Sequence, residues 1–384
     1  MLYGITAATV SFLLAAGLTA LLRAAALRLA LVDRRRVRPV PLLGGVAVLL
    51  VTGLVAGACQ WAGVVHLGPG VVRLLVAGCV VGLLGLAADL WRLRRRWLLA
   101  GTAVAAACVV PYEGTGPLAG ALAVAWIALV ATAFRGLDHA DGLAGAVGVV
   151  TAFGAGVCAA AELMDGLAVL LSALAAALAG FLLHNWHPAR IALGASGSLF
   201  AGFLLAGAAV FTRAGQAPGA SAGVLFALTV PASADAVLVL LSRRLAGRPP
   251  LRGGPDHLAH RLRRLGVTPQ GVVVLLGGGT FCGVLTGVLV HVGRVGETAA
   301  LWVAGASAAV VLGLLRVRVY EPRGTGPHTA VRGTGGVPPS RPGTPGTGVH
   351  GPHRSPLRRA DFPVRQAVGP ENAQVRASLR VRNG

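Results

Sequence analysis

Long apolar runs, separated by short polar segments, dominate the pattern of this chain. About eleven of them approach the roughly 20 residues that a helix needs to cross a bilayer core. They lie near residues 3–22, 40–62, 71–88, 98–111, 117–134, 143–161, 167–183, 198–212, 221–241, 270–291 and 298–316. The pattern therefore predicts an all-α, polytopic membrane protein with about eleven transmembrane helices.

Composition supports this class. Of the 384 residues, 55% are hydrophobic and only 12% are charged, and the mean hydropathy is +0.74. A soluble domain has no use for so much apolar surface, and we expect no nucleic-acid partner. The first run lacks a small-residue cleavage site followed by a soluble domain, which indicates a membrane span rather than a signal peptide.

The placement of positive charge predicts the topology. All 34 Lys and Arg residues are arginines. About 19 of them belong to one alternating set of loops, namely 23–38, 92–96, 135, 190 and 243–264. The opposite set holds three, namely Arg73, Arg213 and Arg294. Because arginine-rich loops stay cytoplasmic, we expect the N-terminus outside, the C-terminus in the cytoplasm and the arginine-rich loops at the inner face.

The composition changes after Tyr320. Residues 321–384 are rich in Pro, Gly, Thr and Arg and almost free of aliphatic clusters, which is typical of disorder. We therefore divide the chain into a membrane domain, 1–320, and a disordered cytoplasmic tail, 321–384, whose positive charge favours the anionic inner leaflet. The five cysteines are scattered through apolar runs, so we expect neither a disulfide nor a metal there.

Two inner loops near the N-terminus carry sparse acidic residues. The first contains Asp33 and the spacing Pro39-x-Pro41-x-x-Gly44-Gly45, and its arginines alone would fit a topological anchor. The second begins after Asp89, which a run of arginines follows. A charged residue at membrane depth is costly and often functional, although an isolated acid beside arginines is more often a charge partner.

The third inner segment is the most acidic part of the membrane domain. It runs from Arg135 to Gly145 and includes Asp138, His139 and Asp141. On a helix Asp138 and Asp141 would share one face, three residues apart. Such a carboxylate pair suits Mg²⁺, a hard cation that prefers oxygen ligands, although Arg135 and His139 would compete with it.

The fourth and fifth segments combine basic and glycine-rich features. The fourth ends at Gly194, Gly197 and Ser198, where backbone N–H groups could approach a phosphate. The fifth, 243–264, mixes histidines with arginines, whose forked guanidinium groups match phosphate oxygens. Taken alone, it could equally be a basic amphipathic loop on lipid headgroups.

In this order, the five segments resemble the polyprenyl-phosphate N-acetylhexosamine-1-phosphate transferases, a family that includes the phospho-MurNAc-pentapeptide translocase. The family patterns are P-x-P-x-x-G-G, G-L-x-D-D, N-A-x-N-x-x-D-G-L-D-G, F-L-x-x-N-x-x-P-A-x-I-x-M-G-D-x-G-S and R-R-x-x-x-G-R-x-x-x-x-x-D-x-x-H-x-H-H-R-L. The resemblance implies a multi-pass protein of the bacterial cell membrane. It also implies that a lipid phosphate attacks a UDP-sugar and releases UMP, with Mg²⁺ assisting, in envelope polysaccharide or peptidoglycan synthesis.

Residue by residue, the resemblance implies catalytic roles for Asp89 and Asp141 and a Mg²⁺ site at Asp89, Asp138 and Asp141. It implies substrate binding by a larger set, namely Asn185, Arg190, Gly194, Gly197, Ser198, Asp256, His257, His260 and Arg261. Three acidic positions of the family pattern are Ala88, Ala144 and Ala195 here.

Two hypotheses therefore stay open. The chain is either a divergent transferase, or a catalytically impaired relative that binds lipid phosphate, a UDP-sugar or a partner enzyme. A homodimer is a further option that the sequence leaves open.

Overall fold

The computed structural model describes residues 2–33, 39–91, 93–249, 254, 256–317 and 319. These residues form thirteen α-helices and one short two-stranded antiparallel ladder, so the predicted all-α class is confirmed. The predicted tail, 321–384, lies outside the described residues.

The first seven helices are α1 (Leu2–Arg28), α2 (Gly44–Trp61), α3 (Gly68–Trp91), α4 (Arg95–Ala107), α5 (Tyr112–Leu137), α6 (Leu143–Ala161) and α7 (Asp165–Asn185). The remaining six are α8 (Gly194–Phe211), α9 (Pro218–Leu228), α10 (Val230–Leu245), α11 (Leu258–Arg264), α12 (Pro269–His291) and α13 (Thr298–Leu315). Strand β1 (Val32–Asp33) pairs with β2 (Val40–Pro41), with Val32 opposite Pro41.

Nine helices in the described part of the chain are long and apolar enough to cross a membrane. A tenth span is formed if α9 and α10, which are bent by 91° where they meet, count as one. The one predicted span that is missing from this set, 98–111, coincides with α4, whose 13 residues extend only about 20 Å at the usual helical rise. The chain is therefore a multi-pass membrane protein whose described residues contain nine or ten candidate spans, and the orientation of its termini stays a prediction.

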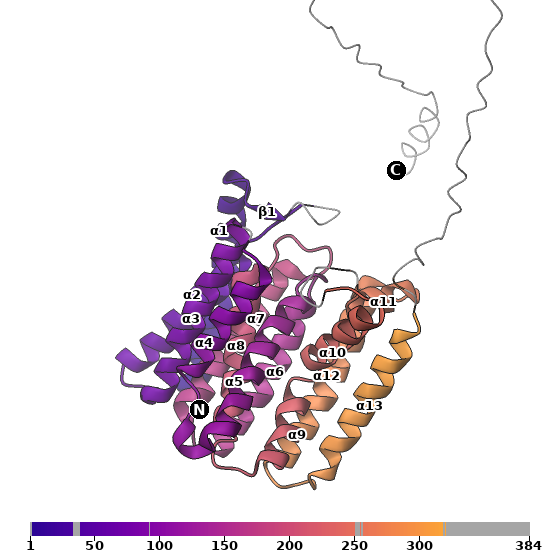
Figure 1. The fold of residues 1–384 in the computed structure, drawn as a ribbon. Coiled ribbons are helices and arrows are strands. Elements are labelled where there is room, and N and C mark those ends of the chain that lie inside the picture. Colours follow the sequence, from indigo (N-terminus) through magenta and orange to yellow (C-terminus); the bar gives the residue numbers. More distant parts are fainter. Residues whose placement is uncertain are drawn as a thin grey trace, which may run out of the picture. The chain divides into compact units, whose positions relative to one another are not determined.

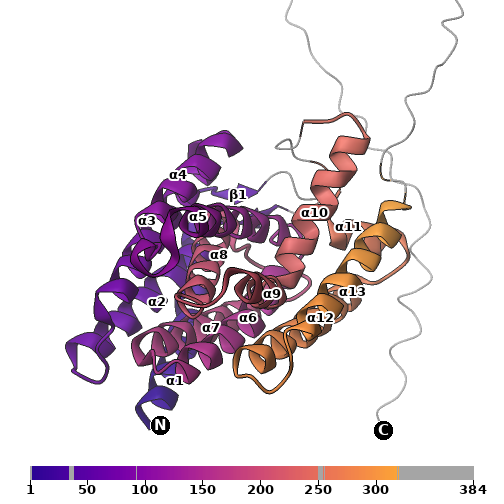
Figure 2. The same cartoon turned by 60° about the horizontal axis from the view of Figure 1, so that its bottom comes forward.

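The long helices run side by side, and β1 and α11 lie near the same end of the bundle (Figure 1). We call this the site end; α3, α5, α7 and α10 finish there and α8 begins there. Helix α8 forms the centre, since 94% of its spanning window is buried, whereas the figure for α1 and α13 is 17%. Figure 2 shows α10 to α13 grouped on one side of the bundle. The outer helices α1 and α13 expose large apolar side chains, including Leu13, Leu21 and Leu301, which suits contact with lipid.

Two motif glycines let α2 approach α8 closely. A Cβ atom at Gly45 would overlap the backbone of Gly197, and one at Gly44 would lie 2.6 Å from the carbonyl oxygen of Ala192. Small residues allow such close backbone approach between membrane helices. The paired glycines of the P-x-P-x-x-G-G spacing therefore serve helix packing at this place.

This contact predicts a position-specific effect of a single methyl group. We expect Gly45→Ala to destabilise the fold by about 3 kcal/mol, the upper part of the range for overpacking, because backbone atoms have to move. The matched control is Gly53→Ala in the same helix, where no atom lies within 4 Å of the added Cβ. Thermal unfolding in detergent should show a lowered midpoint for the first variant alone; equal midpoints would contradict the packing role.

Candidate active site at one end of the helix bundle

The first two predicted segments meet the fourth at the site end. The backbone N–H of Ala192 donates to the carbonyl oxygen of Pro41 at 2.8 Å, which joins β2 to the loop before α8. Asp89, in the last turn of α3, accepts a hydrogen bond from the backbone N–H of Ala195 at 2.7 Å. These two segments therefore meet the fourth at the start of α8.

The third segment also joins the start of α8. Asp138 follows α5, and its carboxylate accepts from the backbone N–H groups of Leu193 at 3.3 Å and Gly194 at 2.9 Å. The first N–H groups of a helix lack intrahelical partners, and the helix dipole favours negative charge beside them. Asp89 and Asp138 therefore cap one helix end from two different helices.

This capping bears on one expectation from the sequence, which stays a prediction. The glycine-rich start of α8 was expected to present N–H groups to a phosphate, but Asp89 and Asp138 already accept from Leu193, Gly194 and Ala195. Gly194 has φ of +72°, and a Cβ there would lie 2.8 Å from Oδ2 of Asp89. A glycine at this position thus allows both the left-handed backbone conformation and the close carboxylate.

Asn185, Gly197 and Ser198 are buried and serve the protein itself. The side chain of Asn185 accepts from the N–H of Gly142 at 2.9 Å and donates to the carbonyl oxygen of Ile191 at 2.7 Å. Ser198 donates to the carbonyl oxygen of Gly194 at 2.6 Å. In this arrangement these residues hold the loop before α8, and their predicted contact with substrate stays a prediction.

Asp141 lies nearer the surface than Asp138. Its Oδ2 atom is 2.9 Å from Nδ1 of His187 and accepts from the backbone N–H of Ala189 at 3.1 Å. About a third of the His187 side chain and a quarter of the Asp141 side chain are exposed, at 34% and 23%. Nearby, Arg190 is exposed. The pair Asp141–His187 is therefore a carboxylate and an imidazole within reach of a ligand.

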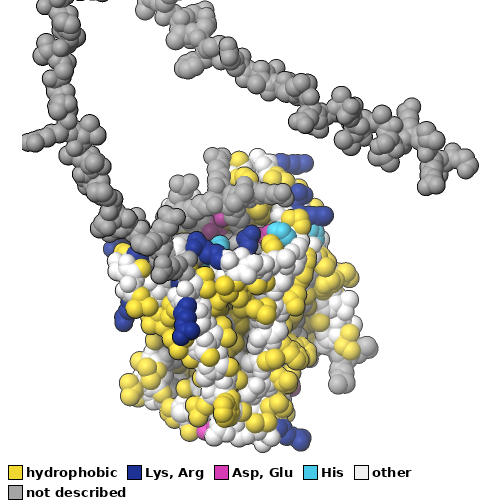
Figure 3. Space-filling view, turned by 90° about the vertical axis from the view of Figure 1, so that its right-hand side faces the viewer, with side chains coloured by type: hydrophobic (Ala, Val, Ile, Leu, Met, Phe, Trp, Pro, Cys, Tyr) yellow, Lys and Arg dark blue, Asp and Glu magenta, His cyan; other side chains and the backbone are white. Residues whose placement is uncertain are grey.

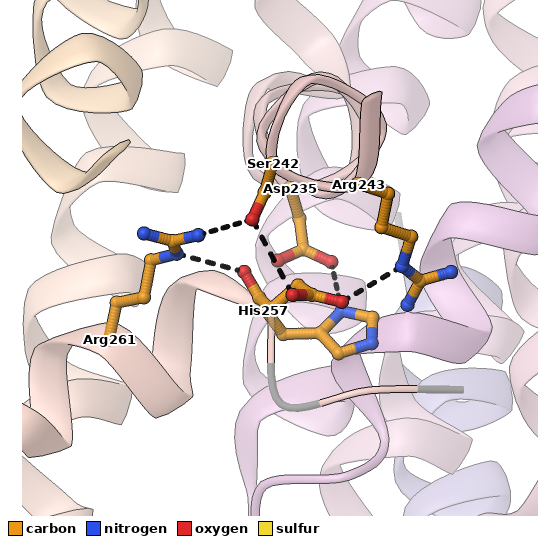
Figure 4. A network of polar contacts seen from close by, with 6 residues as sticks. Asp235, Ser242, Arg243, His257 and Arg261 are labelled. Atoms are coloured by element: carbon orange, nitrogen blue, oxygen red, sulfur yellow. Dashed lines mark hydrogen bonds and ion pairs between the residues drawn. The ribbon is translucent and has the colours of Figure 1, made fainter. Parts of the chain in front are cut away.

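The fifth segment is built on a buried ionic network (Figure 4). Asp256 is fully buried, and its Oδ2 atom accepts from Nε of Arg243 at 2.8 Å. Arg261, 2% exposed, donates to Oγ of Ser242 at 2.6 Å and to the carbonyl oxygen of Asp256 at 3.2 Å. These contacts hold the loop between α10 and α11.

Arg261 also reaches the end of α13. One of its Nη atoms donates to the carbonyl oxygens of Leu314 and Val317, each at 2.7 Å. Asp256 and Arg261 were expected to bind substrate, but their buried side chains are engaged with the protein. Their placement supports a positioning role for the loop that carries His257.

Sequence reasoning gave no role to Asp235, an acid inside an apolar span. Its Oδ2 atom lies 2.7 Å from Nδ1 of His257, and its Oδ1 atom accepts from the N–H of Leu258 at 2.7 Å. The sequence did contain one signal that could have pointed to Asp235: a carboxylate at membrane depth rarely lacks a function or a partner. Asp235 orients His257, one of the predicted substrate-binding residues.

His139 connects the third and fifth segments. Its ring centroid lies 4.5 Å from that of His257 and 4.4 Å from that of His260. Nδ1 of His139 contacts the carbonyl oxygen of Gly136. Burial, followed by the neighbouring His257 and His260, lowers the pKa of His139 from 6.5 to about 3, and burial lowers the pKa of His260. His139 is therefore neutral at physiological pH.

Polar groups gather at the site end. In Figure 3, Arg, His and acidic side chains gather mainly at the upper end of the molecule, above a largely hydrophobic flank. His187, His257 and His260 are partly exposed there, and Arg190 is exposed. Such a face, with basic groups beside the accessible Asp141, can bind a diphosphate and accept a proton.

The fit to Mg²⁺ is poor in the described part of the chain. Asp89 and Asp138 accept from the start of α8, and Asp141 accepts from His187 and Ala189. No group of three or more His, Cys, Asp or Glu side chains among the described residues could hold a metal ion. Asp89, Asp138 and Asp141 therefore do not form the expected three-carboxylate set, and the assignment of Mg²⁺ stays a prediction.

Comparison with known proteins identifies relatives over most of the chain. Residues 71–213 match the family model described as glycosyl transferase family 4. A Streptomyces coelicolor protein with a provisional glycosyltransferase name is 67% identical over 100% of both chains. The decaprenyl-phosphate N-acetylglucosaminephosphotransferase of Mycolicibacterium smegmatis is 30% identical over 72% of this chain and 78% of its own. The phospho-N-acetylmuramoyl-pentapeptide-transferase of Moorella thermoacetica is 34% identical over 40% of this chain and 46% of its own.

The helix cap predicts different effects for two substitutions of Asp138. We expect Asp138→Ala to lower the free energy of unfolding by about 2 kcal/mol, because two N–H groups at the start of α8 lose their acceptor. Asp138→Asn keeps one acceptor oxygen and should cost about half as much. Unfolding midpoints in detergent would measure both; wild-type midpoints for both variants would show that the cap does not stabilise α8.

The histidine cluster predicts a loss of stability in acid. Unfolded His139 binds a proton near pH 6.5, whereas folded His139 stays neutral until about pH 3. Between these values the unfolded state binds more protons, so the free energy of unfolding falls as the pH falls, by about 1.4 kcal/mol per pH unit for one group. Unfolding midpoints across this range should fall less steeply for His139→Phe; identical slopes would contradict the assignment.

Proposed function

Because this chain belongs to glycosyl transferase family 4, together with polyprenyl-phosphate hexosamine-1-phosphate transferases, we propose that it transfers a sugar-1-phosphate to polyprenyl phosphate. The donor is a UDP-N-acetylhexosamine of the GlcNAc or MurNAc-peptide type, and UMP is released. The reaction takes place in the bacterial cell membrane, where this multi-pass protein resides. The product serves cell-envelope polysaccharide or peptidoglycan synthesis.

The proposed reaction exchanges one phosphate linkage for another. An oxygen of the lipid phosphate attacks the β-phosphorus of the UDP-sugar and forms a new P–O bond. The bond between that phosphorus and the bridging oxygen breaks, and the bridging oxygen leaves with its electron pair on UMP. If the lipid phosphate enters as its monoanion, one proton has to be removed. Such a transfer depends mainly on positioning and charge neutralisation.

The convergence of five separate segments at one end of the bundle is the observation that carries the proposal. Within it, Asp141 is a partly exposed carboxylate, and its contact with His187 at 2.9 Å offers a path for the proton. We assign Asp141 as the group that deprotonates the lipid phosphate. We assign binding of the diphosphate to Arg190, His257 and His260. Asp89, the other predicted catalytic acid, accepts a hydrogen bond from the start of α8, and its catalytic role stays a prediction.

The second hypothesis is a catalytically impaired relative that binds lipid phosphate, a UDP-sugar or a partner enzyme. Ala88, Ala144 and Ala195 motivate it, since alanine can neither ligate a cation nor accept a proton. It predicts nucleotide binding without turnover, which the following experiment separates from transfer.

The test is release of UMP from UDP-GlcNAc, or from a UDP-MurNAc-peptide, by the purified full-length protein with polyprenyl phosphate in detergent. We expect turnover by the wild type and a loss of about 100-fold or more in Asp141→Asn, the usual range for a general base. Asparagine keeps an acceptor for Ala189, so the substitution removes charge with little change in shape.

Asp165→Asn is the matched control, because Asp165 is exposed in the first turn of α7, at the end opposite Asn185. It should leave turnover unchanged. Turnover by Asp141→Asn equal to that of the wild type would refute the assigned role of Asp141. Binding of UDP without UMP release from any donor would favour the impaired relative.

A further inference from the structure

We propose that the turn between α3 and α4 binds the headgroups of anionic phospholipids. The surface consists of Trp91, Arg94, Arg95, Arg96 and Trp97, and we call it the headgroup surface. It lies at the site end, because α3 finishes there and α4 begins four residues later. The inference goes beyond the proposed function, since it concerns the membrane around the protein and neither the sugar donor nor the lipid acceptor.

Helix α3 carries an exposed apolar face that leads to this surface. Val76, Val80 and Leu83 are each more than half exposed, and their spacing of four and three residues places them on one face of the helix. Leu90 is also exposed and continues the same face seven residues after Leu83. Because α3 is one of the candidate spans, this face contacts the lipid chains.

Helix α4 repeats the arrangement. Trp97 and Val104, seven residues apart, are 58% and 67% exposed. In Figure 2, α3 and α4 lie at the edge of the bundle, on the side away from α12 and α13. Both exposed faces are therefore open to the surrounding lipid.

A tryptophan ends each apolar face at the site end. Trp91 is the last residue of α3 and is 74% exposed, and Trp97 lies in the first turn of α4. Exposed tryptophans gather at membrane–water interfaces, because the ring is apolar and its N–H is a donor. The two rings therefore mark the level of the lipid headgroups on this side of the protein.

Three arginines lie between these rings along the chain. Arg94, Arg95 and Arg96 are exposed. The guanidinium of Arg96 lies 5.3 Å from the ring centroid of Trp97, within the range of a cation–π contact. This contact places positive charge beside the ring, and hence at the level of the headgroups.

The chemistry of the headgroup surface fits a phosphodiester lipid with a net negative charge. A guanidinium fork matches two phosphate oxygens at once, and a tryptophan N–H can donate to a phosphate or ester oxygen. A zwitterionic headgroup brings a positive group toward the same arginines, which weakens its attraction. Each basic residue at the membrane surface favours anionic lipid by about fivefold. The headgroup surface therefore favours phosphatidylglycerol and cardiolipin over phosphatidylcholine.

Binding there also bears on the candidate active site, because the end of α3 carries Asp89. Asp89 lies two residues before Trp91 and accepts from the backbone N–H of Ala195 at 2.7 Å. A headgroup that holds Trp91 and the arginines holds the last turn of α3 as well. We therefore expect anionic lipid to stabilise the folded protein, as any ligand of the folded state does.

The first measurement is tryptophan fluorescence of the full-length protein in phosphatidylcholine bilayers that contain brominated phosphatidylglycerol or brominated phosphatidylcholine. Bromine quenches a ring that it touches, and the quenching that is lost in Trp91→Phe/Trp97→Phe reports on these two rings. We expect stronger quenching by brominated phosphatidylglycerol. In Arg94→Gln/Arg96→Gln the relative affinity for this lipid should fall by about 25-fold, from about fivefold for each arginine.

Arg263→Gln/Arg264→Gln is the matched control, because both arginines are exposed on α11 near the same end and the same charge is removed. This variant should keep the preference for phosphatidylglycerol at Trp91 and Trp97. An equal loss in both double variants would show that net charge alone attracts the lipid, and it overturns the inference. Equal quenching of the two rings by both brominated lipids in the wild type also overturns it.

The second measurement is the unfolding midpoint in detergent. Added phosphatidylglycerol should raise the midpoint of the wild type more than phosphatidylcholine does, and Arg94→Gln/Arg96→Gln should lose this difference. A difference that is absent from the wild type or that persists in the variant overturns the inference. So does an equal rise with glycerol phosphate alone, which would indicate a site for soluble phosphate. None of these outcomes depends on UMP release, so the inference and the proposed function stand or fall separately.

Discussion

The capping of α8 by two carboxylates from other helices is the constraint on which this end of the molecule depends. Helix α8 is almost entirely surrounded by protein, so its first N–H groups cannot turn to water as they would at a surface. An unpaired N–H in an apolar interior costs several kcal/mol. Asp89 and Asp138 remove that cost, and in doing so they tie the ends of α3 and α5 to one point.

The second anchor is the ionic network of the fifth segment. Asp256 is held between Arg243 and the segment that carries Arg261, and Arg261 in turn binds the end of α13. A buried ion pair contributes little net stability, because desolvation offsets attraction, but removing one partner is costly. The network thus favours one arrangement of the loop and sets His257 beside Asp235.

Hydropathy was enough to predict the all-α membrane class, because every spanning helix satisfies its own backbone and needs only a long apolar sequence. It could not show that α9 and α10 meet at 91°, although Pro231 lies near the break. The spacing of Asp138 and Asp141 suggested a shared helical face. In the structure the helix ends at Leu137, and the two carboxylates turn to different partners.

The candidate site was harder to predict than the fold, because sequence patterns do not show which residues contact one another. Gly45, Gly197 and Asn185 match ligand-like patterns, yet they are explained by close helix packing and by hydrogen bonds to a loop. A short sequence pattern can contain residues needed for packing and residues needed for chemistry. The pattern alone does not tell the two kinds apart, because both would give the same spacing. His139 and Asp235 show the opposite case, because their importance arises from contacts between segments distant in sequence.

The bond between Asp89 and position 195 runs through the main chain. Any residue with an N–H group can donate it, whatever side chain it carries. This hydrogen bond at the beginning of the central helix is therefore the same whether an acid or a methyl group follows Gly194. A lineage could alter its reactive groups at this point while inheriting the same architecture intact.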